Sequence, residues 1–106
     1  MKNRDTILIV DDIEINRAIL CSLFEHDFRL LEAENGEQAL ALARKYHEHM
    51  AIMLLDLNMP VKGGYQLMTE LKEEGLLSRL PVIIITAEDS SENEVKAFDL
   101  GASDII

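Results

Sequence analysis

The chain has 106 residues, a length typical of one domain and short for two. It carries 10 Lys and Arg residues against 20 Asp and Glu residues, a formal net charge of −10. This balance argues against direct binding of DNA or RNA, because a surface that contacts phosphates must be positive. Apolar residues make up 48% of the chain, which is enough for a buried core and argues against disorder.

The cysteine content and the lengths of the apolar runs indicate in which cellular compartment the protein works. Cys21 is the single cysteine of the chain, so no internal disulfide can form, which suits a reducing compartment. The N-terminal segment leads into a short apolar run at 7–10, too short for the core of a signal peptide. No apolar run approaches the roughly 18 residues of a membrane span. We therefore expect a soluble, cytoplasmic protein with no membrane partner.

In chain order, the first predicted element is a strand at 7–10, a continuous apolar run that suits a strand covered on both faces. A helix is predicted over 15–25, where apolar residues recur at helical spacing. A weaker strand follows at 28–33. The next helix is predicted over 37–46, with apolar residues on one face.

The alternation continues in the second half of the chain. The apolar run at 51–55 predicts a third strand, and a helix is predicted over 65–74 with Gly75 as its stop. A fourth strand is predicted at 82–85. The last predicted helix begins at a capping box formed by Ser91 and Glu94 and stops at Gly101. Residues 103–106 are then the predicted start of a fifth strand.

Strands that alternate with helices of about ten residues indicate an α/β fold with right-handed crossovers. The fold class we expect is a doubly wound, five-stranded parallel sheet with helices on both faces. Five such strands usually carry five helices, and no helix follows 103–106. We therefore expect residues 1–106 to be one domain that is truncated within or just after its fifth strand, with the last helix missing.

Carboxylate and hydroxyl side chains directly follow the three strands that are predicted from continuous apolar runs. Asp11 and Asp12 directly follow the first strand, Asp56 the third and Thr86 the fourth. Ligands of open parallel sheets bind at these carboxyl ends. If the first and third strands are neighbours, about 4.8 Å apart, their carboxylates converge and repel one another.

A hard divalent cation would remove this repulsion. Mg²⁺ prefers oxygen ligands, is held by one or two carboxylates plus waters, and often works beside phosphate. The alternative for a single Asp in such a place is a solvated loop residue or a helix N-cap, and for Asp12 the N-cap is an equal alternative. The chain has no glycine-rich dinucleotide or Walker motif, so a phosphate group must arrive on its own carrier.

The same segments resemble the receiver domains of response regulators in two-component signalling. The resemblance covers essentially the whole chain in order, and it implies the flavodoxin-like strand order 2-1-3-4-5. The matching segments are ILIVDD at 7–12 with Asn16-Arg17, AENGEQAL at 33–40, LLDLNMP at 54–60 with Gly64, IITA at 84–87 and GASD at 101–104.

The resemblance implies a role for each acidic residue. Asp56 would be the phosphoacceptor, since a carboxylate nucleophile can form an acyl phosphate. Asp11, Asp12 and Asp56 would bind Mg²⁺ together with the backbone carbonyl of Asn58. Mg²⁺ is therefore the cofactor that we expect.

The resemblance also implies roles for residues near these carboxylates. The Thr86 hydroxyl would donate a hydrogen bond to a phosphoryl oxygen, and the small Ala87 side chain would leave room for the phosphoryl group. Pro60 and Gly64 would shape the loop after the acceptor.

Two features depart from the family's pattern. Receivers carry a Lys after the fifth strand, which by spacing would fall beyond Ile106. Many also carry Tyr or Phe as a rotameric switch where this chain has Ile105. Because Ile has no ring to swing inward, a signal from Thr86 would reach the surface through packing and loop shifts.

The resemblance predicts a phosphoacceptor receiver domain. A sensor histidine kinase or phosphotransfer protein would donate the phosphoryl group, and an output domain or partner protein would receive the signal. The chain would be a signalling domain that catalyses its own phosphorylation and dephosphorylation, and not an enzyme that turns over an external substrate. One alternative is a degenerate receiver that acts only as a protein-interaction module. The other is an Asp-nucleophile phosphatase, which usually carries a second Asp where Asn58 stands.

The expected missing helix has a consequence for association. Some of Ile83, Ile85, Ile105 and Ile106 would point toward the place of that helix, and exposed apolar patches mark interfaces. The last strand would also be an unprotected edge. We therefore expect a homodimer through the flank formed by 82–85 and 103–106, an exchange of elements between protomers, or a fold less stable than a longer chain.

Overall fold

The structure is a computed structural model that describes residues 4–57, 62–85 and 98–105. Its centre is one five-stranded sheet with the order β2-β1-β3-β4-β5, in which each neighbouring pair runs parallel. This order and the α/β class confirm the predicted fold. The strands are β1 (Thr6–Val10), β2 (Arg29–Ala33), β3 (Met50–Leu55), β4 (Val82–Ile84) and β5 (Asp104–Ile105).

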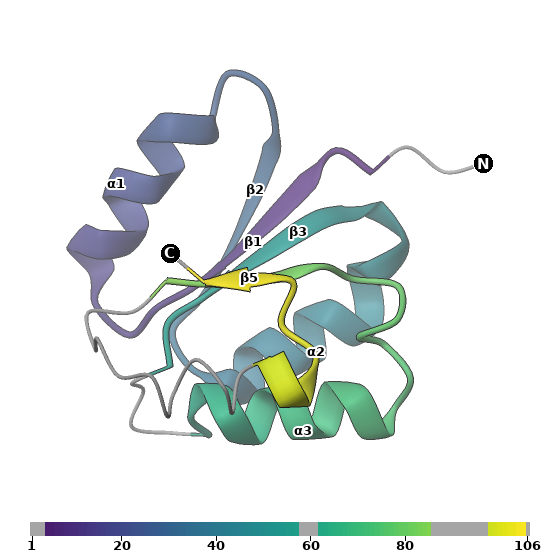
Figure 1. The fold of residues 1–106 in the computed structure, drawn as a ribbon. Helices are drawn as coiled ribbons and strands as arrows, with labels where there is room; N and C mark the ends of the chain where they lie inside the picture. Colours follow the sequence, from purple (N-terminus) through teal and green to yellow (C-terminus); the bar gives the residue numbers. More distant parts are fainter. Residues whose placement is uncertain (1–3, 58–61, 86–97, 106) are drawn as a thin grey trace.

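Helices cover both faces of this sheet, as the doubly wound prediction requires. Figure 1 shows α2 and α3 on one face and α1 on the other. The helices are α1 (Glu14–Phe24), α2 (Gly36–Tyr46) and α3 (Gly64–Glu73), and a short 3₁₀ turn, η1 (His47–His49), leads into β3. Residues 98–100 are also helical, whereas the capping box at Ser91 and Glu94 lies outside the described residues. Within the described ranges, no helix is long and apolar enough to span a bilayer.

Alternate residues of each strand face opposite sides of the sheet, because the side-chain period of a strand is two. Leu8 and Val10 of β1 join the larger core beneath α2 and α3, whereas Ile7 and Ile9 face α1. The larger core also contains the apolar faces that the sequence predicts for the two helices, namely Ala39, Leu40 and Ala43 of α2 and Leu67, Met68 and Leu71 of α3.

Helix α1 buries fewer of its apolar side chains than its composition suggests. Leu20 and Phe24 are partly buried against Ile7 and Ile9 of β1, but Ile19 and Leu23 are exposed. The helix carries apolar residues on two sides, so its helical spacing alone does not reveal which side faces the sheet. Arg17 is the residue of α1 that is buried, although its charged side chain gives it no place in the apolar pattern of the helix.

A bidentate ion pair joins the carboxyl-terminal ends of α2 and α3. Arg44 donates from Nε to Glu74 Oε1 over 2.8 Å and from Nη2 to Glu74 Oε2 over 2.7 Å. This hydrogen bonding holds the pKa of the Glu74 carboxyl below its usual value. Both groups are at the surface, so salt and solvent screen the interaction.

The Arg44–Glu74 pair should make the stability of the domain depend on pH. A lowered folded-state pKa means that the pair stabilises the fold above the ordinary Glu pKa of about 4.3 and loses this effect as pH falls through the folded-state value. We expect Glu74→Gln to lower the thermal midpoint at neutral pH and low salt, and the difference from the native chain to vanish in acid. Glu73→Gln, a neighbouring exposed carboxylate, is the control for charge alone. A deficit in Glu74→Gln that persists unchanged in acid would contradict this origin.

Candidate functional site

The acidic residues lie at the carboxyl edge of the sheet because adjacent strands end at the same level. Val10 of β1 pairs with Leu55 of β3 in the parallel register. The backbone N–H of Asp56 then donates to the Val10 carbonyl over 2.9 Å, and that of Asp11 donates to the Ala33 carbonyl over 3.1 Å. The two carboxylates therefore leave neighbouring strands at one height.

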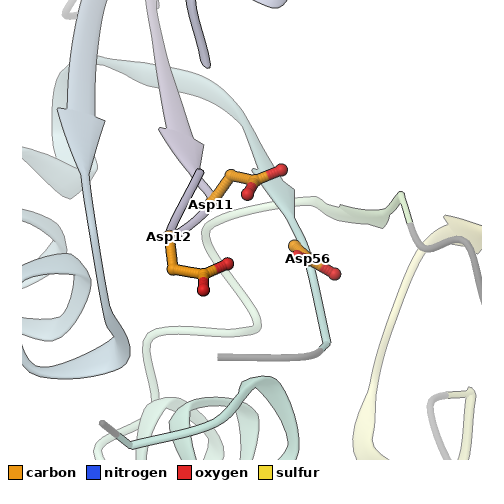
Figure 2. A group of neighbouring side chains, drawn as sticks. All are labelled: Asp11, Asp12 and Asp56. Carbon is orange, nitrogen blue, oxygen red and sulfur yellow. The ribbon is translucent and has the colours of Figure 1, made fainter. Parts of the chain in front are cut away.

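The structure brings together the three carboxylates of Asp11, Asp12 and Asp56. One oxygen of each lies within 4.8 Å of the oxygens of the other two. Figure 2 shows the three side chains gathered at the ends of β1 and β3. The strand-end argument therefore placed these residues together correctly, and we refer to them below as the acidic cluster.

The members of the acidic cluster differ in exposure. Asp11 is 8% exposed, Asp56 is half-buried and Asp12 is exposed. The Asp11 Oδ1 atom accepts a hydrogen bond from the Ile13 N–H over 2.9 Å. Ile13 is the N-cap residue of α1 and makes no side-chain cap, so the alternative that Asp12 is the N-cap is wrong.

The acidic cluster fits a hard divalent cation. Its donors are carboxylate oxygens, which Mg²⁺ prefers over nitrogen or sulfur. Asp11 is the buried member of the cluster and Asp12 is the exposed one, so an ion bound between them would keep access to water. Three like charges this close repel one another, and a cation between them would offset that repulsion.

Gly64 packs tightly against the backbone that follows the acidic cluster. It begins α3, and its N–H donates to the Leu57 carbonyl over 3.2 Å. A Cβ atom at position 64 would lie 2.8 Å from Leu57 Cα and 3.1 Å from the Asp56 carbonyl oxygen. Glycine therefore allows α3 to approach the end of β3. Of the other predicted site residues, Asn58, Pro60, Thr86 and Ala87 lie outside the described residues.

Sequence reasoning assigned no structural role to two cationic residues, Arg17 and Lys62. Lys62 has a left-handed backbone with φ of 49°, and its carbonyl accepts from the Gly36 N–H over 3.1 Å. Its Nζ atom lies 2.6 Å from Glu70 Oε2 of α3. Arg17 donates from Nη1 to the Asp11 carbonyl over 2.8 Å. No periodic pattern points to either contact, because both join segments that only the folded chain brings together.

The chain is similar to known proteins along almost its whole length. The response regulator receiver domain family matches residues 7–106. The transcriptional regulatory protein SrrA of Staphylococcus aureus is 39% identical over 101 residues, which cover 94% of this chain and 40% of that protein. The probable transcriptional regulator ycf29 of Pyropia yezoensis is 35% identical over 95 residues, which cover 90% of this chain and 42% of that protein. The chain thus spans less than half the length of these relatives.

A solved structure shares the fold of this chain over almost its whole length. The CheX–CheY–BeF3–Mg²⁺ complex from Borrelia burgdorferi contains a chain that superposes with a TM-score of 0.89 at 25% sequence identity. The superposition covers 96% of this chain and 76% of that chain.

Proposed function

Because the chain belongs to the response regulator receiver domain family, we propose that it accepts a phosphoryl group on Asp56 and relays the signal through a conformational change. Members of this family are signalling domains and not enzymes that turn over an external substrate. The observation that carries the assignment to Asp56 is the acidic cluster, whose three carboxylates approach within 4.8 Å at the carboxyl edge of the sheet.

The reaction needs a nucleophile at the end of β3. A carboxylate oxygen of Asp56 would form a bond to phosphorus, while the bond from phosphorus to its donor breaks and the donor leaves with the bonding electrons. The donor would be the phosphohistidine of a sensor kinase or phosphotransfer protein. The product carries a charge of about −2 at a position that held about −1 before.

Asp11, Asp12, Asp56 and the backbone carbonyl of Asn58 would hold Mg²⁺, which would neutralise charge on the carboxylates and the phosphoryl group. The chain itself contributes positioning, which dominates catalysis of phosphoryl transfer. Hydrogen bonds to the backbone fix Asp11 and Asp56. Within this proposal Thr86 donates to a phosphoryl oxygen, and Ala87 leaves space for the group.

The signal would pass to an output domain or a partner protein, and the cytoplasm is the location that suits such a relay. A homodimer through the flank of β4 and β5 stays a prediction of the sequence. It is supported by Ile83 and Ile85, which are only partly buried where they pack on the α1 side of the sheet.

Acetyl phosphate tests the proposed function without a cognate kinase. The chain is incubated with this donor with and without Mg²⁺, and intact mass and phosphate release are followed together. We expect one added phosphoryl group per chain that depends on Mg²⁺. Steady release of phosphate without accumulation of a labelled chain would identify a phosphatase instead. Absence of both labelling and phosphate release would identify a module that acts only through protein contact.

The proposed metal site predicts opposite effects of the same substitutions on binding and on folding. Asp11→Asn and Asp12→Asn should each weaken Mg²⁺ binding, because each removes a charged ligand. In metal-free buffer, both should raise the thermal midpoint, because each removes a like charge from the acidic cluster. Melting curves in EDTA and in Mg²⁺ measure both effects. Asp27→Asn, beyond the far end of α1, is the control of equal charge. Destabilisation of the metal-free chain by both cluster substitutions would refute mutual repulsion.

A further inference from the structure

We propose that Arg17 is a positioning residue for the acidic cluster, which fixes the turn between β1 and α1 so that Asp11 and Asp12 present their carboxylates to a divalent cation. The inference rests on the proposed function, because it presumes that the acidic cluster binds Mg²⁺. It assigns Arg17 no contact with the ion or with the phosphoryl group.

The environment of Arg17 is unusual for an arginine at the surface of a helix. The residue is only 8% exposed, although Arg is almost never buried without partners. Its guanidinium reaches two carboxylates of the β2 edge: Nε donates to Glu32 Oε1 over 3.1 Å, and Nη2 lies 3.9 Å from Glu34 Oε1. These contacts anchor the guanidinium to a strand rather than to solvent.

From this anchored position the guanidinium holds the backbone beside the acidic cluster. Its Nη1 atom donates to the Asp11 carbonyl oxygen over 2.8 Å in a buried hydrogen bond. That oxygen belongs to the peptide plane that links Asp11 to Asp12. A bond to it therefore sets the direction in which the chain leaves Asp11 and the place from which the Asp12 side chain projects.

Arg17 completes a set of three restraints on Asp11. The Asp11 N–H is bonded to the Ala33 carbonyl, and its Oδ1 atom accepts from the Ile13 N–H. Of these three hydrogen bonds, the one from Arg17 is donated by a side chain, whereas the other two are donated by backbone N–H groups. Its loss would leave a buried carbonyl without this partner, and the peptide plane would turn to find another.

The electrostatic alternative predicts the opposite sign. A guanidinium close to the acidic cluster repels a cation, so its removal without any change in positioning would strengthen Mg²⁺ binding. A positioning role predicts weaker binding despite the loss of that repulsion. Groups that orient metal ligands from outside the ligand set typically change metal affinity by about 10–100-fold when replaced. The direction of the change in affinity therefore decides between the two.

The test measures the dissociation constant for Mg²⁺ by isothermal titration calorimetry on the native chain, Arg17→Met and Arg17→Lys. Arg44→Met is the matched control, because it removes the same charge from another arginine that pairs with a carboxylate, between α2 and α3. Circular dichroism establishes that each variant is folded under the titration conditions. We expect Arg17→Met to bind Mg²⁺ about tenfold more weakly, at the lower end of the usual range, and Arg44→Met to bind as the native chain does. Arg17→Lys keeps the charge but lacks the planar fork that spans two partners, and we expect it to bind more weakly than the native chain.

Each outcome of this test has one meaning. Weaker binding by Arg17→Met, with no change in Arg44→Met, supports positioning. Equal or tighter binding by Arg17→Met overturns it, and so does an equal loss in both variants, which would reflect net charge or general destabilisation. If Arg17→Met does not fold, Arg17→Lys decides, and native affinity in that variant overturns the inference. A native chain that fails to bind Mg²⁺ would instead refute the metal site of the proposed function.

Discussion

Asp56→Asn is expected to abolish the transfer of a phosphoryl group from acetyl phosphate to this chain. The amide has nearly the shape of the carboxylate but is not a nucleophile, so no acyl phosphate can form. The substitution also removes one of three like charges that lie within 4.8 Å of one another, so the variant should fold at least as well as the native chain. A complete loss of labelling in a variant that melts at or above the native temperature would therefore not reflect unfolding.

Intact-mass spectrometry after incubation with acetyl phosphate and Mg²⁺ measures this effect. Asp99→Asn removes an exposed carboxylate outside the acidic cluster and should label as the native chain does. Labelling of Asp56→Asn at the native level would show that the acceptor lies elsewhere.

Gly36→Ala should cause a large loss of stability, because the packing around Gly36 leaves no room for a side chain. Gly36 begins α2 and donates its N–H to the Lys62 carbonyl over 3.1 Å. A Cβ atom at this position would collide with that carbonyl oxygen and lie 2.7 Å from the Lys62 Cγ atom. The Lys62 segment cannot retreat freely, because its ammonium group pairs with Glu70 over 2.6 Å. We expect a cost of about 3 kcal/mol, the upper part of the range for overpacked sites.

Urea denaturation of Gly36→Ala and Gly75→Ala separates steric collision from backbone strain. Gly75 has a φ of 74°, and a Cβ atom there would meet nothing within 4 Å. Gly75→Ala should therefore carry only the left-handed backbone penalty of about 1 kcal/mol. Equal losses in the two variants would show that the contact with Lys62 does not constrain the fold.

The sheet was predictable from the sequence because its strands are covered on both faces. Buried parallel strands appear as continuous apolar runs, and the observed bounds of β1, β3 and β4 differ from the predicted ones by a single residue at one end. The strand order, by contrast, came from the resemblance to a family, since no local pattern states which strands are neighbours. The predicted end of α3 at Gly75 also holds, because its φ of 74° is a conformation that glycine adopts without strain.

Contacts between distant segments were not predictable in the same way. Helix α1 has apolar residues on both its packed and its exposed sides, as Leu20 and Ile19 illustrate, so its periodicity does not give its orientation. The acidic cluster was accessible to sequence reasoning because strand ends meet at one edge of a sheet. Arg17 donates to the Asp11 carbonyl, and the Lys62 carbonyl accepts from the Gly36 N–H. Such contacts with backbone carbonyls depend on the folded geometry, so no spacing of residues in the sequence predicts them.

The identity of the phosphorylated residue is the most direct test of the central claim. The native chain is labelled with acetyl phosphate in the presence of Mg²⁺, the acyl phosphate is reduced with borohydride, and the modified peptide is located by mass spectrometry. The account predicts a single modified residue, Asp56. Modification of a histidine or serine, or of an aspartate outside the acidic cluster, would contradict it.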